Sequence, residues 1–254
     1  MSEMLNRFRS TVLNLQSASV LDQRLLISQS GDLATYYSPF EHLNEQARVV
    51  LVGITPGKFQ AQAALDQLRA CLREGFSDAD ALRRAKETAS FSGSMRTALV
   101  EMLDRIGLHV ALGLRSSADL FGTARSLVHY TSVLRHPVFA KGENYAGNPA
   151  ILRTPYLKGM TDQWLADEVR KLPNALWIPL GKEPTAVMRS FAERGLIEGD
   201  RVLDGLPHPS GANAERIAYF LGRKQRGQLS SKTRAESIDS ARDVLIRKVS
   251  GVRG

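Results

Sequence analysis

Two short, almost continuous apolar runs constrain the fold of this chain more than any other feature. They are Val49–Val52 and Leu176–Pro179, which lie within the segments Arg48–Gly53 and Ala175–Leu180. A strand covered by helices on both faces is apolar throughout, whereas a strand with one solvated face alternates apolar and polar residues. Both segments are therefore predicted to be buried strands of an α/β protein.

Two further strands are predicted at Ser126–Val133 and Arg201–Asp204. Helical patterns lie between the strands, and the clearest one stops at Gly107, a good helix C-cap. It is formed by Leu99, Met102, Leu103 and Ile106. Strands that alternate with helices pair in parallel through right-handed crossovers. We therefore expect a three-layer α/β/α sandwich around a short, mostly parallel four-stranded sheet.

The 254 residues, of which 43% are hydrophobic, suffice for one sizeable domain. We expect a single domain over residues 1–254, with a helical insertion at about 61–89 and a basic helical segment at about 222–254. Ser77 is the predicted N-cap of the second helix of the insertion. In the final segment, Ile238, Ala241, Leu245 and Val249 form an apolar stripe that is predicted to dock on the domain.

The charge of the chain favours a polyanionic partner. Lys and Arg number 34 against 26 Asp and Glu, which gives a net charge of +8 and a pI near 9.8. Residues 222–254 hold nine basic and three acidic residues, so most of the excess charge lies there. DNA is the partner we expect, and a merely soluble basic protein is the alternative.

Cys71 is the single cysteine, so an internal disulfide and a thiolate metal cluster are excluded. The apolar runs are too short to cross a bilayer, and residues 1–9 lack the apolar core of a signal peptide. These features predict a cytoplasmic protein, nucleoid-associated if bacterial, with no membrane partner.

Two loops hold the candidate functional residues, because ligands of open α/β sheets bind at the carboxyl ends of the strands. The first is Gly53–Phe59, where Gly57 lets the backbone approach a ligand and Lys58 supplies a charge suited to phosphate. By itself such a turn is more often an ordinary loop. The second is Leu206–Asn213, where prolines on both sides of His208 hold its imidazole rigidly.

Both loops resemble motifs of one family. Gly53-Ile-Thr-Pro-Gly57 resembles the Gly-x-Asn-Pro-Gly turn of the mismatch-specific and single-strand-selective uracil-DNA glycosylases. His208-Pro-Ser-Gly-Ala-Asn213 resembles their His-Pro-Ser-Pro-x-Asn loop. Three further segments occur in the order of the family, namely Ser90–Arg96, Tyr130–Leu134 and Trp177–Lys182. The resemblance to the uracil-DNA glycosylase superfamily runs from about Arg48 to Leu221.

The resemblance implies that a nucleotide is flipped out of DNA, because the C1′–N bond cannot be reached inside a stacked duplex. His208 would donate to the departing base, and Thr55 would position water. The base itself would be bound by Phe59, Phe91 and Thr131. Phosphates would be held by Gly57, Lys58, Ser210 and Asn213, and by Arg223, Lys224 and Arg226 in the basic segment. The two loops, Phe91 and Thr131 are predicted to line one pocket.

The chain departs from the family at three positions. Relatives usually carry a carboxylate or an amide at Thr55, and a threonine hydroxyl can orient water but is a poor general base. Asp66 is the nearest substitute, unless it is a solvated helix residue. Uracil readers commonly carry Asn at Thr131, and Gly211 replaces a proline. Together these departures predict a roomier pocket, for a bulky modified base or another lesion rather than plain uracil.

The leading hypothesis is therefore a monofunctional DNA glycosylase that hydrolyses an N-glycosidic bond and leaves an abasic site, acting as a monomer without a cofactor. One alternative is a non-catalytic protein on the same fold that binds single- or double-stranded DNA. Another is a nucleoside or nucleotide hydrolase, which would leave the basic segment unused. No metal site is expected, because His129, His136 and His208 are too scattered to define one.

Overall fold

The computed structural model describes residues 2–15, 19–90 and 94–251. The chain divides into two compact units, and each is described here by itself. The first unit comprises Met1–Glu45, Gly53–Ser90 and Tyr130–Lys171. The second unit comprises Gln46–Val52, Phe91–His129 and Leu172–Gly254. The expectation of one continuous domain stays a prediction.

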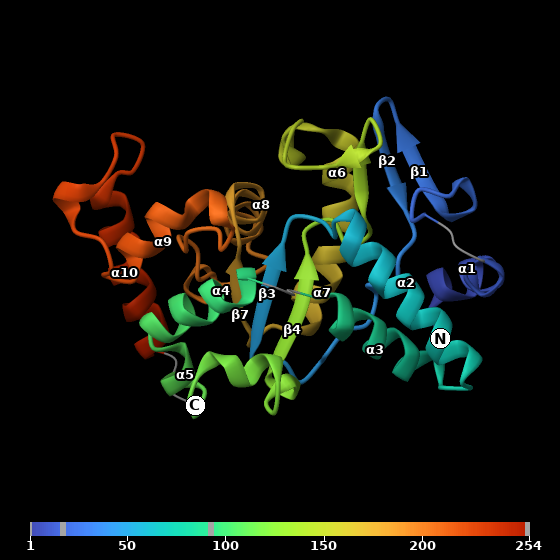
Figure 1. Cartoon of the computed structure of the whole chain (residues 1–254), viewed down its shortest axis with the longest axis horizontal. Helices are drawn as coiled ribbons and strands as arrows, with labels where there is room; N and C mark the ends of the chain where they lie inside the picture. Colours follow the sequence, from blue (N-terminus) through green and yellow to red (C-terminus); the bar gives the residue numbers. More distant parts are fainter. Residues whose placement is uncertain (1, 16–18, 91–93, 252–254) are drawn as a thin grey trace. The chain divides into compact units, whose positions relative to one another are not determined.

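A small parallel sheet contains the two apolar runs. Its strands are β3 (Val49–Gly53), β4 (Val128–Ser132) and β7 (Leu176–Pro179), in the order β4-β3-β7 (Figure 1). β3 pairs with β7 from Val49 opposite Leu176 to Val52 opposite Pro179. Residues Val49 to Val52 are fully buried, as the absence of polar side chains predicts. The prediction of an α/β protein with three of these strands is confirmed.

The predicted fourth strand, Arg201–Asp204, is wrong. Val202 forms an isolated parallel bridge with Trp177, and the Leu203 amide donates to the Trp177 carbonyl at 2.8 Å. A 3₁₀ turn, Gly199–Arg201, ends directly before this bridge, and Gly205 at φ 110° turns the chain directly after Asp204. The extended stretch is therefore too short to form a ladder, and the parallel sheet has three strands.

The helices of the second unit are α4 (Ser94–Arg105), α5 (Leu108–Ala111), α8 (Lys182–Glu193), α9 (Ala214–Phe220) and α10 (Ala235–Gly251). They include three that were predicted, α4, α9 and α10, and two that were not, α5 and α8. α10 docks through its apolar stripe, since Leu245 and Val249 are buried, and the Tyr219 hydroxyl of α9 donates to Asp239 at 2.8 Å. The predicted docking of the final helix is confirmed.

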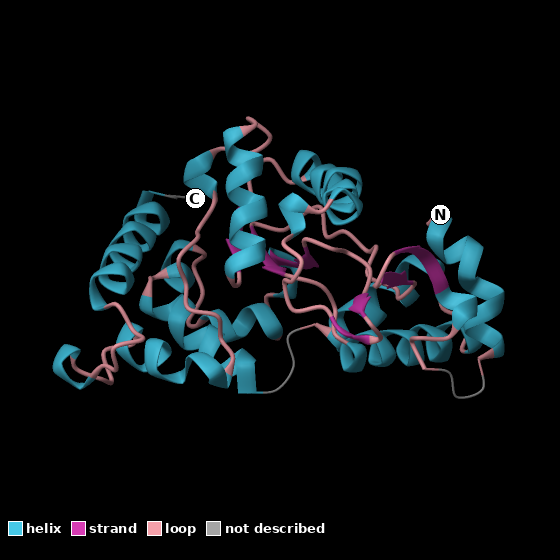
Figure 2. Cartoon of the chain, turned by 90° about the horizontal axis from the view of Figure 1, so that it is seen from above, coloured by secondary structure: helices cyan, strands magenta, loops and turns pink. Residues whose placement is uncertain are grey.

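The first unit contains an antiparallel sheet that the sequence did not predict. Its strands are β1 (Leu26–Ser30), β2 (Leu33–Tyr36), β5 (Val138–Ala140) and β6 (Glu143–Asn144), in the order β1-β2-β5-β6. Strands are short throughout the chain, as the magenta segments in Figure 2 show. Two-residue turns join the hairpins, at Gly31-Asp32 and at Lys141-Gly142, where both residues of the second turn have positive φ.

The helices of the first unit include the predicted insertion. They are α1 (Glu3–Asn14), α2 (Lys58–Arg73), α3 (Asp78–Ala89), α6 (Pro155–Met160) and α7 (Ala166–Lys171). Ser77 caps α3 by accepting from the Asp80 amide, which confirms the predicted start of that helix. A π-helical turn, Thr161–Leu165, joins α6 to α7.

Buried polar groups in the first unit surround His136. Its Nδ1 lies 3.1 Å from the Ser38 carbonyl, and its ring meets Trp164 edge-on with a centroid distance of 4.9 Å. Arg135 pairs with the buried carboxylate of Glu168 at 2.8 Å, and the buried Lys86 ammonium donates to a backbone carbonyl at 2.6 Å. His136 is thus anchored through its Nδ1, while its Nε2 has no hydrogen-bond partner among the described residues.

Along the parts of the chain that the structure describes, no helix has both the length and the apolar character that crossing a membrane requires.

Candidate functional site

The loop that carries His208 belongs to the second unit and is shaped by glycine. Gly205 adopts φ 110°, and a Cβ at this position would lie 2.9 Å from the Cβ of Ala241 on α10. Only glycine fits this turn without displacing the helix. The chain then passes His208, forms the 3₁₀ turn Gly211–Asn213 and continues into α9.

His208 is held as a neutral hydrogen-bond donor. Its Nδ1 accepts from the Ser210 amide at 3.3 Å, so in the neutral ring the proton resides on Nε2. Burial lowers the pKa of His208 below its ordinary value, because the charged form loses hydration. At neutral pH the loop therefore presents an Nε2–H donor rather than an imidazolium cation.

Gly181, directly beyond the carboxyl end of β7, packs against the imidazole. It adopts φ 101°, and a Cβ there would lie 3.2 Å from the Cδ2 of His208. This contact is tighter than side chains normally tolerate, so glycine allows the ring to keep its place.

Gly181→Ala is therefore expected to push the ring of His208 toward solvent and raise its pKa toward the ordinary value. An NMR titration of the imidazole protons measures this. Gly195→Ala is the control, because Gly195 also has positive φ, at 72°, but its Cβ would meet nothing within 4 Å. Both variants should lose about 1–3 kcal/mol of stability through backbone strain. An unchanged His208 titration in Gly181→Ala would contradict the proposed packing.

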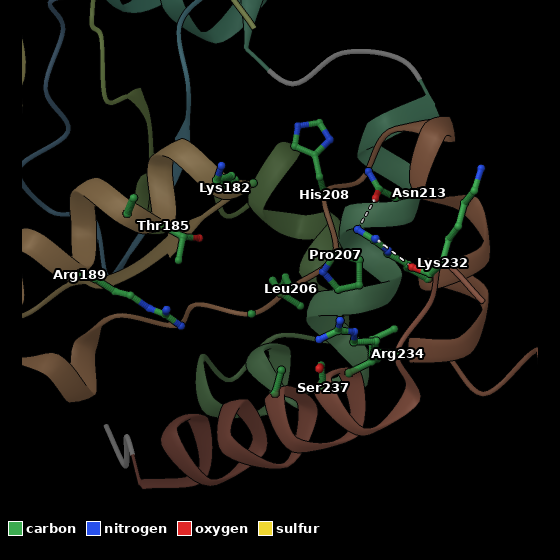
Figure 3. Close-up of a pocket in the computed structure, with 16 residues that line it drawn as sticks. Lys182, Thr185, Arg189, Leu206, Pro207, His208, Asn213, Lys232, Arg234 and Ser237 are labelled. Atoms are coloured by element: carbon green, nitrogen blue, oxygen red, sulfur yellow. Dashed lines mark hydrogen bonds between the residues drawn. The ribbon is translucent and has the colours of Figure 1, made fainter. Parts of the chain in front are cut away.

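A cationic cavity of about 860 Å³ adjoins this loop in the second unit. Five basic side chains line it, together with His208 and Asn213, and its lining contains no carboxylate. The basic residues are Lys182, Arg189, Arg216, Lys232 and Arg234. In Figure 3 the ring of His208 projects at the rim, away from Arg234, while Arg189 and Lys232 lie on opposite sides.

The cavity charges differ in how far they are neutralised. Arg189 pairs with Asp204 at 2.6 Å, and Arg216 contacts the Asn213 side chain and the Lys232 carbonyl, each at 3.4 Å. Among the residues that the structure describes, no carboxylate pairs with Lys182, Lys232 or Arg234. Three uncompensated cations around one cavity make it suited to an anion. From the sequence, Lys232 and Arg234 were counted in the basic segment and Lys182 at the end of a family segment, but none of the three was assigned to a binding site.

The three basic residues of the final segment that were predicted to contact phosphate are paired with carboxylates. Arg223 pairs with Glu101 at 2.8 Å, Lys224 pairs with Glu215 at 2.7 Å, and Arg226 pairs with Glu236. Their charges are therefore partly neutralised within the chain. Their role in binding phosphate stays a prediction.

The polar groups of the His208 loop form hydrogen bonds within the loop itself. The Ser210 amide is used by His208, and the Ser210 hydroxyl accepts from the Asn213 side chain at 3.3 Å. Asn213 also lines the cavity, which leaves it close to any anion bound there.

The Gly53–Phe59 turn belongs mainly to the first unit, where its polar groups are already engaged. The Thr55 hydroxyl donates to the His136 carbonyl at 3.1 Å and accepts from the Val138 amide at 3.0 Å. The amide of Gly57 donates to Gln60 at 3.1 Å, and that of Lys58 donates to Asn144 at 2.8 Å. Thr55 thus joins the turn to β5, which limits its freedom to handle water.

Asp66 lies on α2 with half of its side chain exposed, and it pairs with Arg69 at 2.8 Å. This is the geometry of a surface helix residue, which was the alternative reading of Asp66. Phe59, in the first turn of the same helix, is 79% exposed. An aromatic ring this exposed contributes little to folding and is accessible to a ligand.

Thr131, near the end of β4, is 94% buried, since 6% of its surface is accessible. Its hydroxyl oxygen has no hydrogen-bond partner among the described residues. A buried polar atom without a partner costs free energy, and His136 Nε2 and Trp177 Nε1 are further examples among the described residues.

Phe91 lies outside the described residues. Thr55, Phe59 and Thr131 belong to the first unit, and His208 belongs to the second. Their convergence on one pocket stays a prediction. Within the described ranges, no three His, Cys, Asp or Glu side chains are grouped so that they could hold a metal ion.

Comparison with known proteins gives one relative of similar length. The chain is 36% identical over 231 residues to the uncharacterized protein YoxB of Bacillus subtilis (strain 168), and the alignment covers 90% of each chain. No protein-family model and no solved structure matches the chain. Identity at this level over nearly the whole length of both proteins reflects common descent and a common fold. The chain therefore belongs to the same protein family as YoxB.

Proposed function

We propose that the protein is a DNA glycosylase of the uracil-DNA glycosylase type, built as a three-layer α/β/α sandwich. The observation that carries this proposal is the neutral His208 donor at the rim of a cationic cavity. A neutral imidazole suits a leaving group that becomes negative, and the surrounding cations suit a phosphate backbone. The family motifs at Gly53–Gly57 and His208–Asn213 add support to this reading.

In the proposed reaction, the C1′–N bond breaks and its electron pair leaves with the base. His208 Nε2–H donates to the base as negative charge develops on it. The oxygen of a water molecule then bonds to C1′, and the proton that this water loses neutralises the departed base, so that a free base and an abasic site result. Because the Thr55 hydroxyl is tied to two backbone groups, it can at most orient this water.

A base other than plain uracil fits Thr131 better. A hydroxyl offers one donor and acceptor atom, whereas an amide offers both a carbonyl and an NH₂ to the edge of uracil. The buried, unpartnered Thr131 hydroxyl is suited to one hydrogen bond with the edge of a modified base.

A non-catalytic DNA-binding protein is the second candidate. The pairing of Asp66 with Arg69 and the bonds of Thr55 favour it, because neither residue is placed as a general base. Mass spectrometry of bases released from a panel of damaged and hypermodified DNAs distinguishes the two candidates. Release of a free base supports the glycosylase, whereas tight DNA binding without release from any substrate supports the binding protein.

Phe59→Ala is expected to weaken binding to a single-stranded oligonucleotide about five- to a hundredfold, because stacking is worth about 1–3 kcal/mol per base. Val110→Ala is the matched control, since Val110 is likewise 71% exposed but lies on α5. Fluorescence anisotropy measures both affinities, and thermal melts should be unchanged because both side chains are exposed. Equal affinities of the two variants would remove Phe59 from the binding site.

A further inference from the structure

The cavity between α8, α9 and the segment leading into α10 has the features of a built anion site. Its cations come from separate parts of the second unit: Lys182 from the start of α8, Arg216 from α9, and Lys232 and Arg234 from the segment before α10. The lining contains no carboxylate, although the chain as a whole has 26 acidic residues. Of the acidic residues nearby in sequence, Asp204 pairs with the cavity cation Arg189, whereas Asp239 pairs with Arg242 and accepts from Tyr219.

A second observation concerns Glu215, which fixes one wall of the cavity. Its carboxylate accepts from Lys224 at 2.7 Å, from the Ser230 hydroxyl at 2.6 Å and from the Thr233 hydroxyl at 2.6 Å. The Ser230 amide also donates to it, at 3.2 Å. These bonds hold the pKa of Glu215 well below its ordinary value, so the carboxylate stays charged at any physiological pH. Glu215 thereby holds the segment that carries Lys232 against α9.

We propose that this cavity binds consecutive phosphates of a nucleic-acid strand, through Lys182, Lys232 and Arg234, and that Glu215 is a positioning residue for it. The identification of this strand as DNA rests on the proposed function. A single phosphate fills only a small part of about 860 Å³, and cations on opposite walls are arranged for several phosphates in succession. With phosphates in the cavity, the next nucleotide lies at the rim, where His208 projects (Figure 3).

The test compares two double variants by the salt dependence of binding to a fluorescent 20-nucleotide single strand. Lys232→Gln/Arg234→Gln removes two cations that have no carboxylate partner among the described residues. Arg170→Gln/Lys171→Gln removes two cations that are paired with Asp167 and have no assigned role in binding. The cavity double variant should lower the slope of log K against log salt by about 1.4, at about 0.7 for each phosphate contact of a single strand, with about a tenfold or greater loss of affinity. The control double variant should change both much less.

The positioning role of Glu215 is tested by whether Glu215→Ala weakens or strengthens DNA binding. Glu215→Ala removes a negative charge, which by Coulomb attraction alone would strengthen DNA binding, but it releases the segment that carries Lys232. We expect weaker binding and a shallower salt slope. Glu101→Ala removes the same charge from the Arg223 pair and should leave affinity unchanged or raise it. Melting curves and circular dichroism establish that both variants are folded.

Several results would overturn the proposal. They are an unchanged salt slope in the cavity double variant, an equal decrease in the control double variant, or tighter binding by Glu215→Ala. Competition with pyrophosphate distinguishes a nucleic-acid backbone from a small phosphate compound as the ligand. If pyrophosphate binds and the oligonucleotide does not displace it, the cavity binds small phosphate compounds instead. Because binding is measured without base release, absence of glycosylase activity leaves this inference intact.

Discussion

Replacing His208 with alanine is expected to lower the single-turnover rate of base release about a hundredfold or more, while DNA binding is retained. The reason is that a donor aimed at the departing base acts chiefly in the transition state, where the loss of one such contact commonly costs this much. The neutral ring with its proton on Nε2 is suited to that task. Quenched-flow measurement on a cleavable substrate gives the rate, and anisotropy gives the affinity.

His109→Ala is the matched control, because His109 is a histidine of the same unit that contacts Asp104 and does not line the cavity. Its rate should equal that of the unmodified protein. If His208→Ala releases base at a near-normal rate, the mechanism assigned to His208 is wrong. Thr55→Ala should lower the rate of base release less than His208→Ala does, since the Thr55 hydroxyl is hydrogen-bonded to two backbone groups.

The second large effect is on stability in acid, and it arises at His136. Burial, together with the neighbouring Arg135 and Lys86 cations, lowers the pKa of His136 from 6.5 to about 3, whereas Ser38 and Glu168 act in the opposite direction. Below pH 6.5 the unfolded chain therefore takes up a proton that the folded protein does not bind. Unfolding is favoured as the pH falls, by about 3 kcal/mol between pH 6.5 and 4 at 1.36 kcal/mol per pH unit.

His136→Gln removes this titration but not those of the carboxylates. Urea unfolding of the two proteins between pH 4 and 7 should give a flatter dependence of the unfolding free energy in the variant. The range stays below pH 7 because buried Lys86, with a pKa lowered to about 8, adds a second titration at higher pH that also makes stability rise with pH. Parallel pH dependences in the two proteins would show that His136 titrates normally in the folded state.

The sequence determined those elements whose residues interact with near neighbours. The apolar runs of β3 and β7 were predicted because buried strands need no polar alternation. The Ser77 cap, the end of α4 near Gly107 and the stripe of α10 were predicted because caps and helical spacing act within a few residues. The His208 loop was singled out for the same reason, since prolines, glycine and a helix start are local features.

Only the tertiary structure decided which polar groups have partners, because those partners are distant in sequence. Arg223 was predicted to be available to phosphate, but it pairs with Glu101, 122 positions away. Thr55 was predicted to position water, but its hydroxyl bonds to the His136 carbonyl, 81 positions away. Conversely, Lys232 and Arg234 have no carboxylate partner in the described part of the chain, while Glu215 on α9 is bound to Lys224, Ser230 and Thr233. Charge counts along a chain are local, whereas neutralisation depends on which side chains the fold brings within a few ångströms of each other.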